Sequence, residues 1–304
     1  MKRKERAAFP VTESGDSVEH CFTPLSRGAG PESRTAKSRV PSPSVSWILL
    51  TNDDGIESPA LFPFADALSR IGEVRIVVPD AERSWSSKAI TRYGDIHVTP
   101  ADRNGITALA VSGYPADAVQ VGAHFFDTKP RLVISGINIG YNHGAGYILA
   151  SGTVGAAIEG WELGIKSITF SAGSGGVWSE WRKFAGSNEA IPIWVRLSAL
   201  CAELLEELLA TDLAGDVINV NVPWDAGDET PRRVTSIARV AYGPVYQRVD
   251  DTTFRHRYRQ DFTVHESLEG TDVGVNELGQ IAITPMMMPQ APEVADEVRK
   301  ALER

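Results

Sequence analysis

Short runs of apolar residues alternate with amphipathic stretches along most of this 304-residue chain. Period-2 or continuous apolar patterns indicate strands, and apolar residues at helical spacing indicate helices. The predicted strands cover residues 47–51, 74–78, 96–99, 107–111, 131–135, 165–170, 217–223 and 280–284. The predicted helices cover residues 58–71, 116–125, 154–160, 193–209 and 292–302. Strand, helix and strand within residues 47–78 form a βαβ unit, so we predict an α/β fold with a doubly wound, mainly parallel sheet.

Two stretches depart from this alternation. Residues 171–190 are rich in Gly, Ser and Trp and are predicted to form an exposed excursion from the sheet. Within it, Trp178 and Trp181 could either stack on the base of a ligand or cover the edge of the core. Residues 254–264 are predicted to form an exposed or intersubunit strand with basic residues on one side.

The first 46 residues differ in composition from the rest. They contain eight Lys or Arg and five Asp or Glu, which is a local charge of +3. Because the whole chain carries −9, residues 47–304 carry −12. Ser and Pro are frequent and hydrophobic periodicity is absent, so we predict a disordered extension over residues 1–46 and one α/β domain over 47–304. A passive extension and a targeting or docking segment both fit this composition.

The overall composition excludes several classes of protein. A net charge of −9 argues against binding a nucleic-acid polymer or an anionic membrane surface. A small phosphate ligand still fits, because one metal ion can reverse the local field. The two cysteines provide neither a disulfide framework nor zinc-ligand spacing. No apolar run has the length of a membrane span and no secretory signal is evident, so a cytoplasmic protein is predicted.

The end of the first predicted strand carries the strongest candidate for chemistry. Asn52, Asp53, Asp54 and Gly55 follow the apolar run 47–51 directly. In an open α/β sheet, the carboxyl end of a strand faces the ligand crevice. Two neighbouring carboxylates repel each other there unless a cation binds them or one is protonated. The stretch is therefore either a metal site or a polar turn, since these residue types also favour turns.

Two further predicted strands end in polar loops, and they favour the metal site. Ser84 lies in the loop after the strand 74–78, and Asn138 and Asn142 follow the strand 131–135. Parallel strands bring these loops to one sheet edge together with Asp53 and Asp54. Carboxylate, hydroxyl and amide oxygens suit Mg²⁺ or Mn²⁺ better than zinc or copper.

A helix amino terminus adds a possible phosphate site. Ser151 and Thr153 precede the helix 154–160, where free N–H groups and the helix dipole favour an anion. Both are also good N-cap residues without any ligand. With a metal nearby, the natural reaction is hydrolysis of a phosphomonoester by a metal-activated water.

The same motifs resemble those of the SurE family of stationary-phase survival proteins and nucleotidases. The matching stretches are Ile48–Ile56, Val77–Asp80 with Arg83-Ser84 and Ile90-Thr91, Gly113–Asp117, Ser135–Asn142, Ser151–Val154, Asn219–Pro223 and Ile281–Pro285. The resemblance implies a Rossmann-like SurE fold whose carboxy-terminal segment, about 224–304, is exchanged between the subunits of a homodimer or homotetramer.

The resemblance also implies an activity. It is a 5′/3′-nucleotidase that hydrolyses nucleoside monophosphates, with short polyphosphate as a further substrate, and uses one divalent ion per subunit (Mg²⁺, Mn²⁺ or Co²⁺). An aspartyl-phosphate mechanism is disfavoured, because Asp53 and Asp54 are adjacent rather than separated by one residue. The alternative is a nucleotide-binding regulatory protein with little turnover.

The family pattern assigns roles by motif. The implied metal ligands are Asp53, Asp54, Ser84 and Asn138. The implied substrate-binding residues are Asn52, Asn142, Ser151 and Thr153, with Asn52 also orienting the carboxylate loop. The implied catalytic residues are Asp53, Asn142 and Ser151, with Asp53 a candidate to accept the proton of the attacking water.

Three positions depart from the family pattern. Trp85 stands where glycine is usual, Ala89 where a small hydroxyl residue is common, and His143 where an apolar residue is typical. His143 could donate a proton to the leaving alcohol or be a solvated loop residue. These departures bear on substrate preference more than on metal binding.

Overall fold

The computed structural model describes residues 47–175, 177–257 and 262–303, so the predicted tail over residues 1–46 lies outside the described residues. The main sheet contains β1 (Trp47–Thr51), β2 (Glu73–Pro79), β3 (Val98–Pro100), β4 (Thr107–Val111), β5 (Leu132–Ile139), β6 (Lys166–Gly173), β7 (Val217–Pro223), β8 (Arg232–Val234) and β13 (Ile281–Met286). The helices are α1 (Leu61–Leu68), α2 (Pro115–Phe125), α3 (Ala145–Ala150), α4 (Gly152–Glu162), α5 (Trp178–Ala185), the 3₁₀ helix η1 (Asn188–Ala190), α6 (Ile191–Ala210), α7 (Asp272–Glu277) and α8 (Asp296–Leu302).

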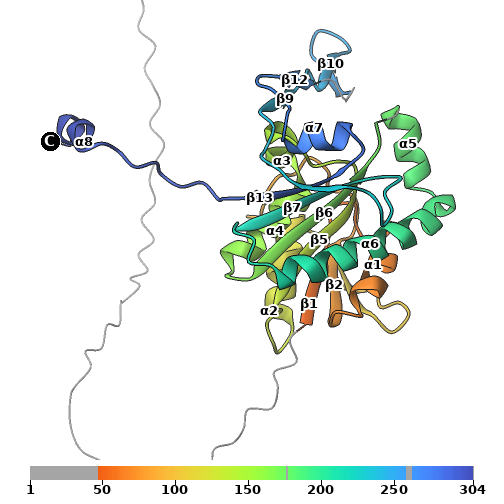
Figure 1. Ribbon diagram of the computed structural model, residues 1–304. Coiled ribbons are helices and arrows are strands. Elements are labelled where there is room, and N and C mark those ends of the chain that lie inside the picture. Colours follow the sequence, from red (N-terminus) through yellow and green to blue (C-terminus); the bar gives the residue numbers. More distant parts are fainter. Residues whose placement is uncertain (1–46, 176, 258–261, 304) are drawn as a thin grey trace, which may run out of the picture. The chain divides into compact units, whose positions relative to one another are not determined.

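The strand order confirms the predicted doubly wound sheet. The order is β3-β4-β2-β1-β5-β6-β7-β13-β8, and all neighbours from β4 to β7 are parallel. Figure 1 shows the part of the sheet that contains β2, β1, β5, β6, β7 and β13. Antiparallel pairs occur where β3 joins β4 and where β13 joins β7. The chain winds outward from β1 in one direction through β2 and β4, and in the other through β5, β6 and β7. The strand order therefore reverses between β1 and β5, which is where such folds place a ligand crevice.

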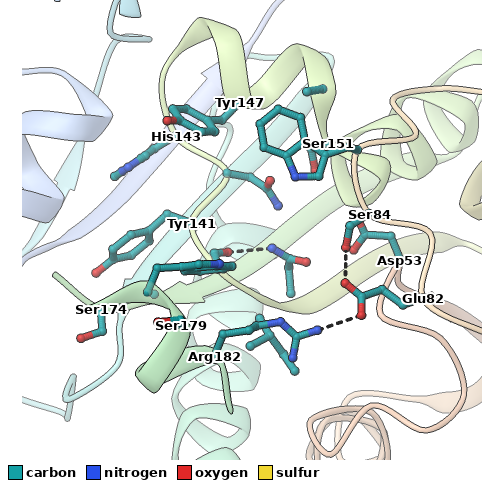
Figure 2. A pocket seen from close by; sticks show the side chains of 18 of the residues that line it. Asp53, Glu82, Ser84, Tyr141, His143, Tyr147, Ser151, Ser174, Ser179 and Arg182 are labelled. Atoms are coloured by element: carbon teal, nitrogen blue, oxygen red, sulfur yellow. Dashed lines mark hydrogen bonds and ion pairs between the residues drawn. The ribbon is translucent and has the colours of Figure 1, made fainter. Parts of the chain in front are cut away.

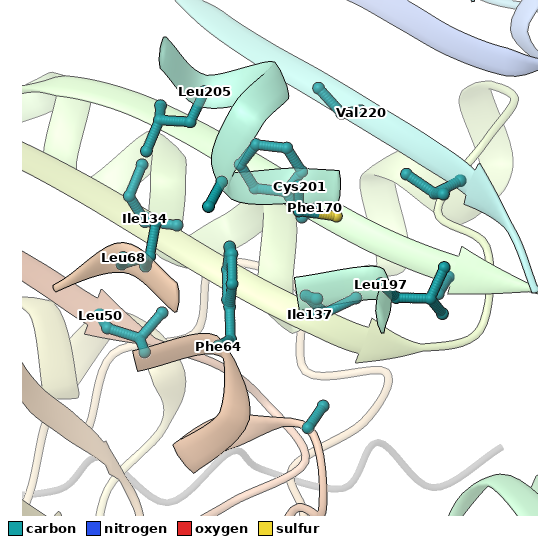
Figure 3. Close-up of a cluster of buried hydrophobic side chains, with 14 of the residues drawn as sticks. Leu50, Phe64, Leu68, Ile134, Ile137, Phe170, Leu197, Cys201, Leu205 and Val220 are labelled. Atoms are coloured by element: carbon teal, nitrogen blue, oxygen red, sulfur yellow. The ribbon is translucent and has the colours of Figure 1, made fainter. Parts of the chain in front are cut away.

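The apolar run of β1 is buried on both faces of the sheet. Ile48 and Leu50 pack into a core cluster with α1 and α6, part of which is shown in Figure 3. Trp47 and Leu49 point to the opposite face, into a second cluster with α2 and α4. Successive side chains of a strand alternate between faces, so a central parallel strand needs apolar residues at every position. This requirement explains why β1 appears as a continuous apolar run in the sequence.

The prediction of an exposed excursion over residues 171–190 was wrong. The first three residues complete β6, and the segment then forms α5 and η1. Trp181 is only 8% exposed, and its ring lies 5.5 Å from that of Trp224 in an edge-to-face pair. The indole nitrogen of Trp194 donates to the carbonyl oxygen of Ala185 at the end of α5 (2.8 Å). Both partners, Trp194 and Trp224, lie outside the segment 171–190, so the composition of the segment did not reveal these contacts.

The carboxy-terminal part of the chain is less regular than predicted. The range 254–264 contains two short strands, β11 (Phe254–His256) and β12 (Phe262–Val264), with residues 258–261 outside the described residues. These strands pair with β10 (Tyr246–Arg248) and β9 (Val240–Tyr242). The predicted terminal helix is present as α8, and none of its residues is buried. None of the helices in the described part of the chain is both long enough and apolar enough to cross a lipid bilayer.

Candidate functional site

A cavity of about 1130 Å³ opens at the carboxyl ends of β1 and β5 (Figure 2). Its lining includes five of the predicted site residues, namely Asp53, Ser84, Asn138, Asn142 and Ser151. They come from four separate segments that the parallel sheet brings together. The other three predicted residues, Asn52, Asp54 and Thr153, are not among the lining residues and lie behind the cavity surface.

Asn52 holds the turn that presents the two carboxylates. Its side-chain nitrogen donates to the carbonyl oxygen of Gly55 (3.1 Å), and its side-chain oxygen accepts from the backbone N–H of Gly55 (3.0 Å). Gly55 has a φ of +85°, and a Cβ atom there would lie 2.8 Å from the backbone of Ala81. Only glycine fits this conformation and this close approach. Both ends of the Asn52 amide are therefore used within the turn.

Asp53 and Asp54 are buried next to each other. The hydroxyl of Thr153 donates to Oδ1 of Asp53 (2.6 Å), and the N–H of Ile139 donates to Oδ2 of Asp54 (3.0 Å). Burial raises the pKa of Asp53, although the hydrogen bonds from the Thr153 hydroxyl and backbone N–H oppose this effect. Burial and the neighbouring charge of Asp53 raise the pKa of Asp54 to about 7. A positive charge between the two groups would offset this cost.

The residues around this pair fit a hard divalent cation. The hydroxyl of Ser84 donates to Oε1 of Glu82 (2.7 Å), and the amide nitrogen of Asn138 donates to the carbonyl oxygen of Gly140 (2.7 Å). The oxygen end of the Asn138 amide is thus the end that can take a cation. Among the described residues, no group of three or more His, Cys, Asp or Glu is arranged to hold a metal. A cation would therefore depend on two carboxylates, neutral oxygens and water, as Mg²⁺ sites commonly do.

The amino terminus of α4 packs directly against Asp53. Ser151 is the N-cap, and its hydroxyl accepts from the N–H of Val154 (3.1 Å). A Cβ atom at Gly152 would lie 2.9 Å from the Cβ of Asp53. The hydroxyl and the backbone N–H of Thr153 both donate to Asp53, and Thr153 does not line the cavity. The predicted N-cap is therefore confirmed, and the positive end of the helix dipole lies next to the carboxylates.

Asn142 is fixed by the neighbouring strands β6 and β7. Its side-chain nitrogen donates to the hydroxyl of Ser171 (2.9 Å), and its backbone N–H donates to Oδ1 of Asn221 (2.8 Å). The side-chain nitrogens of Asn219 and Asn221 both donate to its carbonyl oxygen (2.7 and 3.1 Å). The alternating polar residues of β7 are thus fully buried and hold the Asn142 loop in place.

His143 adjoins Asn142 and also lines the cavity. Its ring stacks on Tyr141 with 4.7 Å between centroids, and its Nδ1 lies 2.9 Å from Oδ1 of Asn276. The Asn276 oxygen can only accept, so it assigns the Nδ1 proton and leaves Nε2 as an acceptor in the neutral ring. Burial lowers the pKa of His143, which disfavours the imidazolium form that proton donation to a leaving group would need.

Two charged residues of the site gave no signal in the sequence. Arg182 on α5 points its Nη2 at Oε2 of Glu82 (3.2 Å) and at Oδ1 of Asp54 (3.4 Å). Figure 2 shows Glu82 between Ser84 and Arg182. Trp178, one turn earlier on α5, lines the cavity, whereas Trp181 belongs to the core. Trp178 also packs against the same core cluster, so both tryptophans cover the edge of the core and Trp178 faces the cavity as well.

Aromatic side chains form another part of the cavity lining. Trp85, Tyr147, Tyr246 and His256 all line it. The ring of Trp85 lies 6.3 Å from that of Tyr147 and 5.6 Å from that of His256. Trp85 has a φ of +61°, a conformation that favours glycine. The departure from the family pattern at this position therefore introduces an aromatic ring into the cavity.

The fold and the site define a doubly wound α/β protein with an acidic, oxygen-rich cavity beside a helix amino terminus. The family model "Survival protein SurE" matches residues 48–244. The chain belongs to the SurE family, which confirms the resemblance seen in the motifs.

Relatives match over most of their length. The chain is 37% identical over 248 residues to the 5′-nucleotidase SurE of Methanocella arvoryzae, covering 79% of this chain and 91% of the relative. It is 36% identical over 257 residues to the 5′-nucleotidase SurE of Methanoculleus marisnigri, covering 83% and 95%. The crystal structure of the SurE protein from Aquifex aeolicus superposes with a TM-score of 0.63 at 28% identity, covering 84% of this chain and 98% of that one.

Proposed function

We propose that this protein is a divalent-metal-dependent nucleotidase that hydrolyses nucleoside 5′- and 3′-monophosphates to nucleoside and phosphate. One observation carries the proposal: the side chains of Asp53 and Asp54 are buried at the switch point of the sheet, and Asp53 packs against the amino terminus of α4. Membership of the SurE family and the names of the relatives, 5′-nucleotidase SurE, support the same activity.

The cation would be held by Asp53, Asp54, Ser84 and Asn138, with Mg²⁺, Mn²⁺ and Co²⁺ as candidates and one ion per subunit. When bound, it neutralises the carboxylates and polarises the phosphoryl group. The chain's own residues would do the rest. Ser151 and Asn142 line the cavity and would hold the phosphate oxygens, and the dipole of α4 favours the same anion.

Proton transfer is assigned to Asp53. It lines the cavity and accepts hydrogen bonds from Thr153, which fix the direction of its carboxylate. It would accept the proton of the water that attacks phosphorus. Thr153 and Asn52 would act by positioning the carboxylate pair, because their polar groups bond to Asp53 and to the Gly55 turn.

The nucleoside part of the substrate would lie against the aromatic lining. A phosphate group alone is small relative to a cavity of about 1130 Å³. Trp85, Tyr147 and Tyr246 provide ring surfaces suited to stacking on a nucleobase. Short polyphosphate is a further candidate substrate, and it has no base that could stack on these rings.

A phosphatase screen tests the proposal. Nucleoside 5′- and 3′-monophosphates, glycerol 2-phosphate and short polyphosphate would each be incubated with Mg²⁺, Mn²⁺ or Co²⁺, and with a chelator as control. We expect metal-dependent release of phosphate from nucleotides and none with the chelator. Nucleotide binding without release of phosphate under any of the metals would contradict an enzymatic function.

We also propose that the carboxy-terminal segment takes part in self-association as a homodimer or homotetramer. Every described residue from 289 to 303 is exposed, and the exposed set includes apolar Val298 and Leu302, one turn apart on α8. Val298→Asp with Leu302→Asp should lower the mass measured by light scattering after gel filtration. Lys300→Asp on the same helix is the control, and an unchanged mass in the double variant would contradict this role.

A further inference from the structure

Arg182 lies at the edge of the cavity and contacts two carboxylates there, Asp54 of the proposed cation site and Glu82. Its Nη2 is 3.4 Å from Oδ1 of Asp54 and 3.2 Å from Oε2 of Glu82. The Asp54 side chain is only 4% exposed and that of Arg182 is 27% exposed. The arginine therefore reaches from the cavity surface to a buried site residue.

The helix that carries Arg182 is anchored in the core. Its neighbour Trp181 is buried, and packs on Trp178 (5.4 Å) and Trp224 (5.5 Å). The last residue of the helix, Ala185, is buried and accepts a hydrogen bond from the indole of Trp194. Arg182 is therefore held in place by core packing, unlike an arginine on a freely moving surface loop.

The charge of the site calls for a cation on the substrate side. Asp53 and Glu82 line the cavity, and the carboxyl group of Asp54 lies directly behind it, within reach of Arg182. A divalent ion and a phosphate dianion together add no net positive charge, so an excess of negative charge remains when both are bound. A guanidinium next to the phosphate would reduce this repulsion.

The geometry leaves Arg182 free to take a second ligand. Both of its contacts with the carboxylates use the same nitrogen, Nη2. A guanidinium has five N–H donors in a planar fork that matches phosphate oxygens. The contact with Asp54 is long for a charged hydrogen bond, and it uses an oxygen that a divalent ion bound to Asp54 would also use.

We propose that Arg182 binds the phosphate group of the substrate and competes with the divalent cation for Asp54. Binding of the cation to Asp54 would release Arg182 to the phosphate, so the two ligands would bind cooperatively through this residue. The inference rests on the proposed function only in taking a phosphate as the ligand. It assigns to α5, a segment without a recognised motif, a direct part in substrate binding.

The proposal makes opposite predictions for the two ligands, which a merely structural role would not. Arg182→Met should bind Mn²⁺ severalfold more tightly in the absence of phosphate, because a competing positive charge next to Asp54 is lost. Its affinity for inorganic phosphate at saturating Mn²⁺ should fall by about tenfold or more, because charge-assisted hydrogen bonds are lost. Arg182→Lys should bind phosphate with intermediate affinity, because it keeps the charge but not the fork.

Both affinities can be measured on the full chain without turnover. The paramagnetic resonance signal of free Mn²⁺ reports metal binding, and isothermal titration calorimetry reports binding of inorganic phosphate. Arg70→Met is the matched control, since Arg70 is exposed beyond the end of α1 and its side chain donates a hydrogen bond to the carbonyl oxygen of Ala67, away from the cavity lining. We expect wild-type values for both ligands in this variant.

Two results would overturn the proposal. One is an unchanged phosphate affinity in Arg182→Met, and the other is weaker Mn²⁺ binding in a variant that melts at the wild-type temperature. If Arg182→Met does not fold, the phosphate affinity of Arg182→Lys decides, and a wild-type value there overturns the proposal. Failure of the proposed nucleotidase function would appear separately, as absence of phosphate release by the wild-type chain, and would leave these binding measurements intact.

Discussion

Two walls of the same cavity are built in different ways. The strand-end wall consists of the end of β5, the loops after β1 and β2, and the start of α4. Asp53, Ser84, Asn138 and Ser151 line the cavity here, and the buried side chain of Asp54 lies behind them. The outer wall consists of α5 and the short strands β10 and β11, and carries Trp178, Arg182, Tyr246 and His256. The topology of the sheet determines where the residues of the strand-end wall lie. Contacts between residues distant in sequence determine where those of the outer wall lie. We infer that the first wall supplies the chemistry and that the second selects the ligand.

The largest effect is expected from removing the acidic pair of the strand-end wall. Asp53→Ala with Asp54→Ala should lower metal-dependent phosphate release about 1000-fold or more, because the cation and the proton acceptor are lost together. The fold should remain, since both side chains lie at the sheet edge rather than in the apolar core clusters. A phosphate-release assay and circular dichroism check this, with the exposed Asp66→Asn as control. Wild-type activity in the double variant would contradict the proposed site.

A substitution in the core, rather than in the cavity, should disrupt the outer wall. Trp181→Ala is expected to lower the free energy of unfolding by about 3 kcal/mol, the usual cost of removing a buried tryptophan. It should also weaken phosphate binding, because α5 no longer holds Arg182 in place. Urea denaturation and calorimetry measure the two effects. Trp178→Ala, on the cavity side of the same helix, should cost less stability, and an equal or greater cost would contradict the assignment of Trp181 to the core.

The strand-end wall should destabilise the chain when its carboxylates are charged and no cation is bound. The pKa of Asp54 is raised from 3.8 to about 7, so the folded chain holds a proton that the unfolded chain has lost. The stabilisation from this proton is complete below pH 4 and disappears as the pH rises through 7. An asparagine side chain is neutral at every pH and has nearly the same shape as a protonated aspartate. In a chelator at pH 8, Asp54→Asn should therefore exceed the wild type in unfolding free energy by about 4 kcal/mol.

Chemical denaturation at several pH values tests this difference. The two chains should have similar stability near pH 4, and Mn²⁺ at pH 8 should stabilise the wild type but not Asp54→Asn. Asp66→Asn, an exposed change on α1, should show neither effect. A lower stability of Asp54→Asn at pH 8 in the chelator would mean that the carboxylate is stabilising in the fold.

The contrast between the walls also explains what the sequence could predict. Asp53 follows the apolar strand β1 and Asn138 lies at the end of β5. Parallel topology alone brings strand ends together, so their convergence was predictable. Arg182 lies in a helix whose apolar partners come from other segments, and the Gly- and Trp-rich composition around it suggested an exposed loop. Asn52 and Thr153 were predicted to bind substrate. In the structure their side chains bond to the acidic turn and neither residue lines the cavity. Motifs thus predicted which residues gather, but not which of them face the cavity.

Trp85 follows Ser84 in the strand-end wall, but its ring packs on His256 of the outer wall. It therefore tests whether the two walls differ in function. Its ring packs edge-to-face on Tyr242 (4.9 Å), behind the cavity lining. Trp85→Ala should reduce kcat/KM about tenfold for adenosine 5′-monophosphate, because stacking on the base is lost. Hydrolysis of glycerol 2-phosphate should be unchanged, and an equal loss for both substrates would place Trp85 in the chemistry instead.

The backbone at Trp85 allows a sharper version of this test. Its φ of +61° costs a non-glycine residue about 1 kcal/mol, so Trp85→Gly should be more stable than Trp85→Ala by about that amount. Both variants should lose the preference for nucleotides to the same extent, because both lack the ring. Thermal melting together with the ratio of the two substrates separates backbone strain from base stacking. If Trp85→Gly kept the nucleotide preference, the conformation of the Ser84 loop rather than the indole ring would determine substrate choice.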